Sequence, residues 1–166
     1  LPDGSRACSP EMGVATDGLG APQVVFERTT STWWAFYVVA TGNIRYHALL
    51  ADGTWEPVGL ARYVPGTEAD AQGSPAVVET RSGIFVFCRL RRSERVIAWG
   101  ASDLSSGAWS APYSVAASLS GFPVAAAVDR GQVFVFYRPD PETCPGGQRL
   151  AFRTFLPGLT PDPDPT

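Results

Sequence analysis

The chain has 166 residues, of which 45% are hydrophobic, and a formal net charge of -3. This length and composition suit one globular domain with its own core, and they exclude a fibrous or generally disordered chain. The acidic balance argues against broad attraction to nucleic acid, and no apolar run approaches the roughly 20 residues that cross a bilayer. We therefore expect a soluble protein with no membrane span and no nucleic-acid partner.

The first part of the chain predicts four short strands. The segments are rich in β-branched and aromatic residues and are separated by turn signals such as Asp52-Gly53. We expect these strands at 22–27, 33–39, 44–50 and at Trp55.

The middle of the chain repeats this order. Strands are expected at 76–80, 84–90, 96–101 and at Trp109, which makes Gly53-Thr54-Trp55 and Gly107-Ala108-Trp109 equivalent. The apolar segment 114–119 is flanked by Pro112 and Gly121, and we interpret it as a connection between repeats.

The last part of the chain predicts only three strands. These lie at 124–128, 132–138 and 149–155, and no Gly-x-Trp follows them. The tail 161–165 alternates Pro with Asp, and prolines cannot donate hydrogen bonds to a sheet. We therefore expect an incomplete third repeat, whose missing strand residues 1–17 could supply.

The strands belong to a repeat that opens with Gly-x-Pro and leads to an aromatic strand. Its glycines, Gly20, Gly73 and Gly121, lie 53 and 48 residues apart, a period that suits a four-stranded propeller blade. We predict an all-β fold, a propeller-like array of about three four-stranded blades. The expected parts are an N-terminal arm (1–18), blade 1 (19–72), blade 2 (73–120), an incomplete blade 3 (121–156) and a Pro-rich tail (157–166).

Three blades leave a closure problem. Propellers close with about four to eight blades, because each blade buries its face against the next one. We therefore expect a homo-oligomer or another chain to complete the ring, unless the missing blades belong to a longer polypeptide.

The repeat resembles bacterial β-propeller lectins of the Photorhabdus type and the related fucose-binding propellers. The clearest stretch runs through 73–78, 84–89 and 107–110. The resemblance implies that monosaccharides bind in clefts between neighbouring blades, over an aromatic ring and against polar side chains. On this basis we expect a carbohydrate-binding module without catalytic activity, with a glycan or monosaccharide as partner. The alternative is a structural or protein-interaction propeller subunit with no sugar site.

Several aromatic residues are candidates for sugar stacking. Trp55 and Trp109 close the first two repeats, although a tryptophan at a repeated position also fits a plug between blades. Tyr46, Trp99 and Phe152 are assigned to one matching position of the third strand, where both interpretations stay open.

Arginines are the candidates for polar contact. Arg45 flanks the third strand of the first repeat, and Arg89 and Arg138 each follow a phenylalanine by two residues. The fork of donors on Arg89 or Arg138 suits adjacent hydroxyls or a carboxylate, and equally a salt bridge to Glu79 or Asp129. The arginine cluster within 89–95 fits a solvated turn better than a partner site.

The three cysteines divide into two kinds. Cys8 and Cys144 lie in Gly/Pro-rich sequence, and we predict a disulfide between them, which would fit a secreted protein. Cys88 lies inside a strand and is expected to be a small buried residue. The Cys and His spacing predicts no metal site, and we expect no cofactor.

The inventory for catalysis is small. His47 is the single histidine, and it has no Ser or Cys nucleophile in a recognisable motif. We predict no catalytic residues and no enzyme activity.

Overall fold

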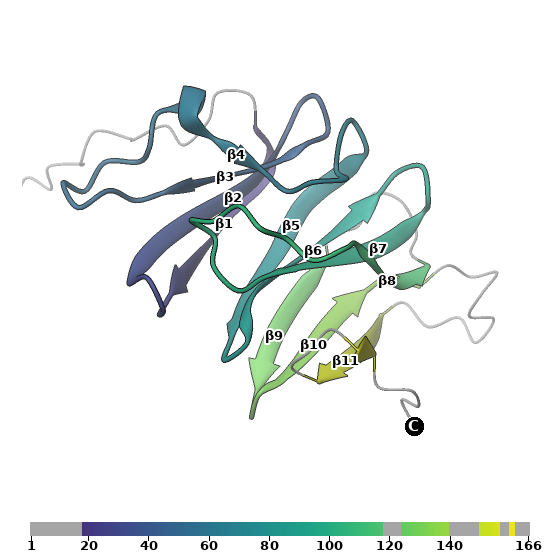
Figure 1. The fold of residues 1–166 in the computed structure, drawn as a ribbon. Helices are drawn as coiled ribbons and strands as arrows, with labels where there is room; N and C mark the ends of the chain where they lie inside the picture. Colours follow the sequence, from purple (N-terminus) through teal and green to yellow (C-terminus); the bar gives the residue numbers. More distant parts are fainter. Residues whose placement is uncertain (1–17, 118–123, 140–149, 157–159, 162–166) are drawn as a thin grey trace, which may run out of the picture.

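The computed structural model describes residues 18–117, 124–139, 150–156 and 160–161. They form three antiparallel four-stranded sheets that follow one another along the chain (Figure 1). The described residues contain no α-helix, and one 3-10 turn spans Val58–Leu60. The all-β prediction is therefore confirmed. The proposed disulfide partners Cys8 and Cys144, and most of the N-terminal arm, lie outside the described residues.

The first sheet is a meander in which each strand pairs with its successor. Its strands are β1 (Gly18–Glu27), β2 (Thr32–Val39), β3 (Ile44–Ala48) and β4 (Arg62–Tyr63). Trp55 was predicted to be the fourth strand, but it forms only an isolated bridge with Leu49. The fourth strand is β4 instead, and two residues are too few to produce a period-2 signal.

The second sheet repeats the meander. Its strands are β5 (Ala71–Thr80), β6 (Gly83–Leu90), β7 (Arg95–Ala101) and β8 (Tyr113–Ala117). Here too the predicted position of the fourth strand, at Trp109, is wrong. The strand lies in the segment that was interpreted as a connection between repeats. Val115 and Ala116 are buried in the core while the strand pairs with β7. Pro112 precedes the strand, so it disrupts no ladder.

The third sheet has a fourth strand as well. Its strands are β9 (Ala125–Asp129), β10 (Gln132–Tyr137), β11 (Ala151–Leu156) and β12 (Thr160–Pro161). We expected the sheet to stop after three strands, but the start of the tail pairs with β11, with Pro161 opposite Phe155. A proline is tolerated there because β12 lies at the sheet edge and has no further neighbour to donate to.

The first strands of the sheets lie side by side, since β1 contacts β5 and β5 contacts β9. Two apolar clusters fill the spaces between the sheets. Trp34 and Phe36 of the first sheet meet Val86 and Cys88 of the second, whose opposite face carries Phe85 and Phe87 toward the third. The two faces of β6 thus serve different cores, as expected from the alternation of side chains along a strand.

The pairing registers identify equivalent positions in the three sheets. In β2, β6 and β10, the middle aromatic position is occupied by Phe36, Phe87 and Phe136. Their partners on the third strand are Tyr46, Ala98 and Phe152, respectively.

None of the helical turns in the described part of the chain has the length and hydropathy required to cross a membrane.

Candidate functional site

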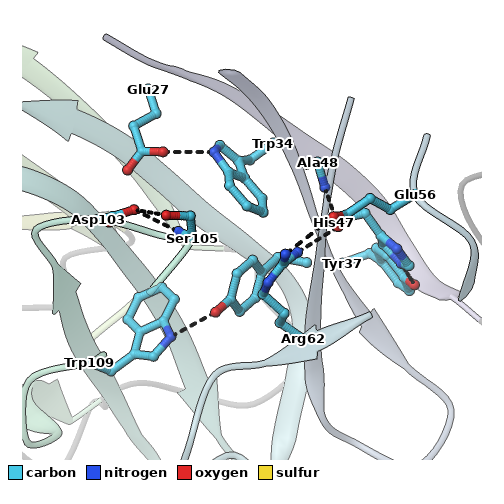
Figure 2. Close-up of polar contacts among 11 residues, drawn as sticks. Glu27, Trp34, Tyr37, His47, Ala48, Glu56, Arg62, Asp103, Ser105 and Trp109 are labelled. Atoms are coloured by element: carbon cyan, nitrogen blue, oxygen red, sulfur yellow. Dashed lines mark hydrogen bonds and ion pairs between the residues drawn. The ribbon is translucent and has the colours of Figure 1, made fainter. Parts of the chain in front are cut away.

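The candidate site lies where the first and second sheets meet, around Tyr46 and Trp109. Figure 2 labels Trp109 together with Trp34, Glu56 and Arg62. The indole N–H of Trp109 donates a 3.2 Å hydrogen bond to the Tyr46 hydroxyl, and the two rings meet edge to face at 5.5 Å. Phe36 stacks on Tyr46, with ring centroids 5.2 Å apart and an interplanar angle of 15°, and it also meets Trp109 edge to face at 6.4 Å. Three aromatic rings from two sheets are therefore fixed against each other.

Tyr46 supports the site from within. β3 directs its side chain into the core, where it is fully buried, while half-buried Trp109 reaches it from the second sheet. Burial raises the pKa of the Tyr46 phenol, and neither the hydrogen bond from Trp109 nor the charge of Arg62 reverses that effect. The hydroxyl thus stays protonated at neutral pH and keeps a donor of its own.

Arg62 places a cation at the same site. Its guanidinium carbon lies 5.1 Å from the ring centroid of Trp34, a cation–π distance, and its side chain is 32% exposed. Two of its nitrogens reach Glu56, Nη1 to Oε2 at 2.5 Å and Nη2 to Oε1 at 3.2 Å. This forked contact fixes the guanidinium plane, because each nitrogen holds a different carboxylate oxygen.

Glu56 is held as a carboxylate by its donors. Burial alone would raise its pKa, but the hydrogen bonds from Arg62 and from the Ala48 N–H outweigh burial and lower the pKa. The Arg62–Glu56 pair is therefore charged at neutral pH.

Glu27 closes the far side of the cluster. Its Oε2 accepts hydrogen bonds from Trp34 Nε1 at 2.9 Å and from Thr30 Oγ1 at 2.5 Å, and its Oε1 accepts one from the Leu104 N–H at 2.9 Å. The side chain is 2% exposed. We assign Glu27 a structural role, since both of its oxygens are engaged within the protein.

The prediction that Trp99 matches Tyr46 is wrong. Register pairs Trp99 with Val86, whereas the position equivalent to Tyr46 is its neighbour Ala98. A shift of one residue reverses the face of a strand, so Trp99 points back toward the first sheet. It is fully buried there, and its Nε1 has no hydrogen-bond partner in the structure.

Arg89 is likewise enclosed. It is 2% exposed and donates a hydrogen bond from Nη1 to Gln72 Oε1. Glu79, one acceptor suggested for it, forms an ion pair with Arg28 at 2.9 Å instead. Arg138 follows the end of β10 and is partly exposed, and it lies on the third sheet, away from the Tyr46 cluster.

Arg45 and Tyr46 lie on opposite faces of β3. Arg45 donates from Nε to the Tyr63 hydroxyl at 2.9 Å and stacks over that ring at 5.1 Å. Because neighbouring residues of a strand alternate, Arg45 cannot contact a ligand held by Tyr46. It belongs to a separate surface.

Trp55 and Trp109 occupy matching places, as the repeat predicted. The Glu56 N–H donates to Ala48 O at 2.9 Å, and after the second tryptophan the Ser110 N–H donates to Gly100 O at 2.7 Å. Trp109 packs against the core between the first two sheets. Trp55 is half-buried on the first sheet, outside that core.

Sequence reasoning missed four members of the cluster: Glu27, Trp34, Glu56 and Arg62. Trp34 stood in the aromatic repeat and was read only as part of a strand. Arg62 lies in a stretch without periodicity, so no sequence signal linked it to Glu56 or to Trp34.

The chain matches no protein-family model, and no curated protein sequence is significantly similar to it. Within the described ranges, no group of three or more His, Cys, Asp or Glu side chains is arranged to hold a metal ion. The function must therefore be argued from the aromatic and arginine cluster itself.

Proposed function

We propose that the three sheets are blades of a propeller-like array, and that the chain binds carbohydrate where the first two blades meet, without catalysing a reaction. The observation that carries this proposal is that Tyr46 is hydrogen-bonded by Trp109 and is paired in register with Arg62 on the neighbouring strand. A half-buried indole offers an apolar face for sugar C–H groups, and a partly exposed guanidinium offers directed donors for hydroxyls.

The site is held rigid, which favours recognition of a small polar ligand. Trp109 is fixed by Tyr46, and Arg62 by Glu56 and the Trp34 ring. A ligand would thus order few side chains on binding, and it would lose little affinity to conformational entropy. The meeting of neighbouring sheets is also where the resemblance to propeller lectins places sugar sites.

Export of the protein is part of this proposal. Export is inferred from the predicted Cys8–Cys144 disulfide. Counting free thiols by mass spectrometry before and after reduction would test whether that disulfide exists. Two free thiols released by reduction support the bond, whereas three thiols reactive in the unfolded, unreduced protein exclude it.

The test of sugar binding is a glycan array followed by titration of tryptophan fluorescence with the sugars that bind. Trp109→Phe should remove most of the sugar-dependent change. Arg62→Lys keeps the charge but loses the fork, and it should weaken binding by about tenfold, equivalent to ~1.4 kcal/mol.

The matched control is Arg91→Lys, an exposed arginine in the turn after β6. It should bind like the unaltered protein. If no sugar binds, or if Arg62→Lys and Arg91→Lys bind alike, the proposed site is wrong.

The second candidate is a structural or protein-interaction subunit. It is favoured by the aromatic face of the third sheet, where Phe152 is 54% exposed. If the chain binds no sugar on the glycan array and forms a stable complex with another protein, this second role would be established.

A further inference from the structure

The three sheets are joined by one repeated kind of contact. We call the face that each sheet turns toward the next sheet along the chain its front face, and the opposite one its back face. The front faces of the first two sheets are buried. Trp34 and Phe36 lie in the core between the first and second sheets, and Phe85 and Phe87 lie in the core between the second and third.

The front face of the third sheet is open. Phe134 and Phe136 are the equivalents of Phe85 and Phe87, yet they are only half-buried, whereas Phe85 and Phe87 are 6% and 1% exposed. Phe152 is 54% exposed beside them, with its ring 6.2 Å from that of Phe134 and 5.9 Å from that of Phe136. These rings form an exposed apolar patch, which is typical of an interaction surface.

The back face of the first sheet cannot cover this patch in a second copy. Ala35, Tyr37 and His47 hold the positions that match, by register, the residues of the second sheet that receive the internal interface. They are only 0%, 2% and 1% exposed within the single chain, so that face is already closed. A second copy must therefore meet the patch with another surface, and the front face of its own third sheet is open.

The front face of the third sheet carries two rows of side chains that differ in size. The row on β9 has the exposed alanines Ala125 and Ala127, and the row on β10 has the larger Phe136 and Phe134. Register pairs Ala125 with Phe136 and Ala127 with Phe134. A shallow row thus runs beside a raised row along the full contact of the two strands.

A twofold axis that runs along the strands between β9 and β10 makes this face complementary to itself. It places β9 of each copy over β10 of the other, so that each phenylalanine faces an alanine and large side chains pack against small ones. By the same register Asp129 of one copy lies opposite Gln132 of the other, where the carboxylate can accept a hydrogen bond from the amide. No two charges of the same sign face each other in these rows.

We propose that two copies of the chain pair through the front faces of their third sheets, with Ala127 of each copy over Phe134 of the other. The contact uses the same surface on both copies, so assembly closes at a dimer. The inference goes beyond the proposed sugar binding and does not depend on it, because the contact of Tyr46 with Trp109 lies between the first two sheets.

Exchanging the large and the small residue tests this geometry. In analytical ultracentrifugation over a concentration series, the unaltered chain should show a monomer–dimer equilibrium without larger species. Ala127→Phe fills the shallow row and Phe134→Ala removes the ring that fits it, so each variant should weaken dimerisation by about tenfold or more. The double variant restores a large side chain opposite a small one, and it should recover most of the lost affinity.

Ala51→Phe is the matched control, because it makes the same change at an exposed alanine in the turn after β3, away from the third sheet. It should dimerise like the unaltered chain, and circular dichroism establishes that every variant is folded. An unaltered chain that stays monomeric up to about 1 mM, or that forms species larger than a dimer, overturns the inference. Dimerisation of Ala127→Phe at the unaltered affinity overturns it as well.

The double variant decides the register of the two copies. If it associates no better than the single variants, the pairing of Ala127 with Phe134 across the twofold axis is wrong. Sugar binding is read separately by the fluorescence titration and should be unchanged in Ala127→Phe. Loss of dimerisation with intact sugar binding in the unaltered chain counts against this inference alone, and the reverse result counts against the carbohydrate site alone.

Discussion

Glu27 and Leu104 are joined across 77 positions of sequence, because the Leu104 N–H donates a 2.9 Å hydrogen bond to Glu27 Oε1. Glu27 belongs to the first sheet, and Leu104 follows the third strand of the second. Both residues are buried, so this bond ties the two sheets together where water does not compete.

Replacing Glu27 should therefore destabilise the protein. Glu27→Ala leaves the Leu104 N–H and the Trp34 indole N–H without their acceptor, and we expect the free energy of unfolding to fall by roughly 3 kcal/mol. Urea denaturation measures this change. Glu79→Ala is the control, because its partner Arg28 has a side chain 79% exposed, and it should cost less than about 1 kcal/mol. Equal losses in the two variants would contradict the assigned role of Glu27.

Gly83 begins β6 in a conformation that other residues rarely adopt, with φ of 128°. A Cβ at this position would meet Ala101 O and would lie 2.9 Å from Ser102 Cα, both on the backbone of the neighbouring strand or just beyond it. Gly83→Ala should thus cost more than the 1 to 2 kcal/mol, roughly, of left-handed strain alone. Gly53 also has a positive φ, 82°, but a Cβ there would meet no other atom within 4 Å. The Gly53→Ala variant therefore measures the cost of the backbone strain alone. In thermal unfolding, the melting temperature of Gly83→Ala should lie well below that of Gly53→Ala. The opposite order would contradict the close approach of Ala101 and Ser102 to Gly83.

The sheets could be predicted from sequence wherever strands are long and apolar. In β2 and β6 the aromatic repeat marks both the strand and the face that meets the next sheet. The fourth strands β4 and β12 have two residues each, and only pairing with a neighbour defines them. The turn signals at Pro112 and Gly121 also led to a wrong interpretation, because the segment between these two residues contains the strand β8.

The site was predicted less well, because it depends on register and on tertiary contact. Trp99 and Ala98 differ by one position, and sequence alone did not tell which of them is equivalent to Tyr46. The contact of Arg62 with Trp34 joins two strands that are not neighbours in the sheet. Tyr46 and Trp109 were each named among the aromatic candidates, but their contact and hydrogen bond could be seen only in the fold.

Cys88 should be inert in the folded protein. It is fully buried, as predicted, and burial raises the pKa of its thiol from 9.0 to about 12. The thiolate is the reactive form, so iodoacetamide should label Cys88 only when the protein unfolds. Mass spectrometry of the peptide that contains Cys88 measures the labelling rate, and the rate should rise with urea as unfolding does. Rapid labelling without denaturant would show that the second sheet opens locally.

The raised thiol pKa also sets a direction for alkaline stability. Ionisation is easier in the unfolded chain, so the contribution of Cys88 is full below pH 9 and declines as the pH rises toward 12. Cys88→Ala should reduce this alkaline loss, although it lowers stability at neutral pH because it leaves a small cavity. Denaturation measured at neutral and at alkaline pH separates the two effects.

His47 should make the protein less stable in mild acid. It is 1% exposed and lies against Tyr37, whose hydroxyl shares a hydrogen bond with Nε2 and whose ring stacks at 5.4 Å. Burial lowers the His47 pKa, Arg45 and Arg62 lower it further, and Glu56 opposes them without restoring the ordinary value of 6.5. The neutral imidazole therefore stabilises the fold fully above pH 6.5.

This contribution is lost as the pH falls through the lowered pKa, because the unfolded chain binds the proton more readily. Denaturation across this range should show the loss in the unaltered chain and a flatter profile in His47→Gln. As His47 is the single histidine, its NMR resonance reports the pKa directly. A measured pKa at or above 6.5 would contradict the buried neutral ring. The Tyr37→Phe variant removes the hydroxyl but keeps the stacked ring, and it should leave the direction of the pKa shift unchanged, since burial is its largest cause.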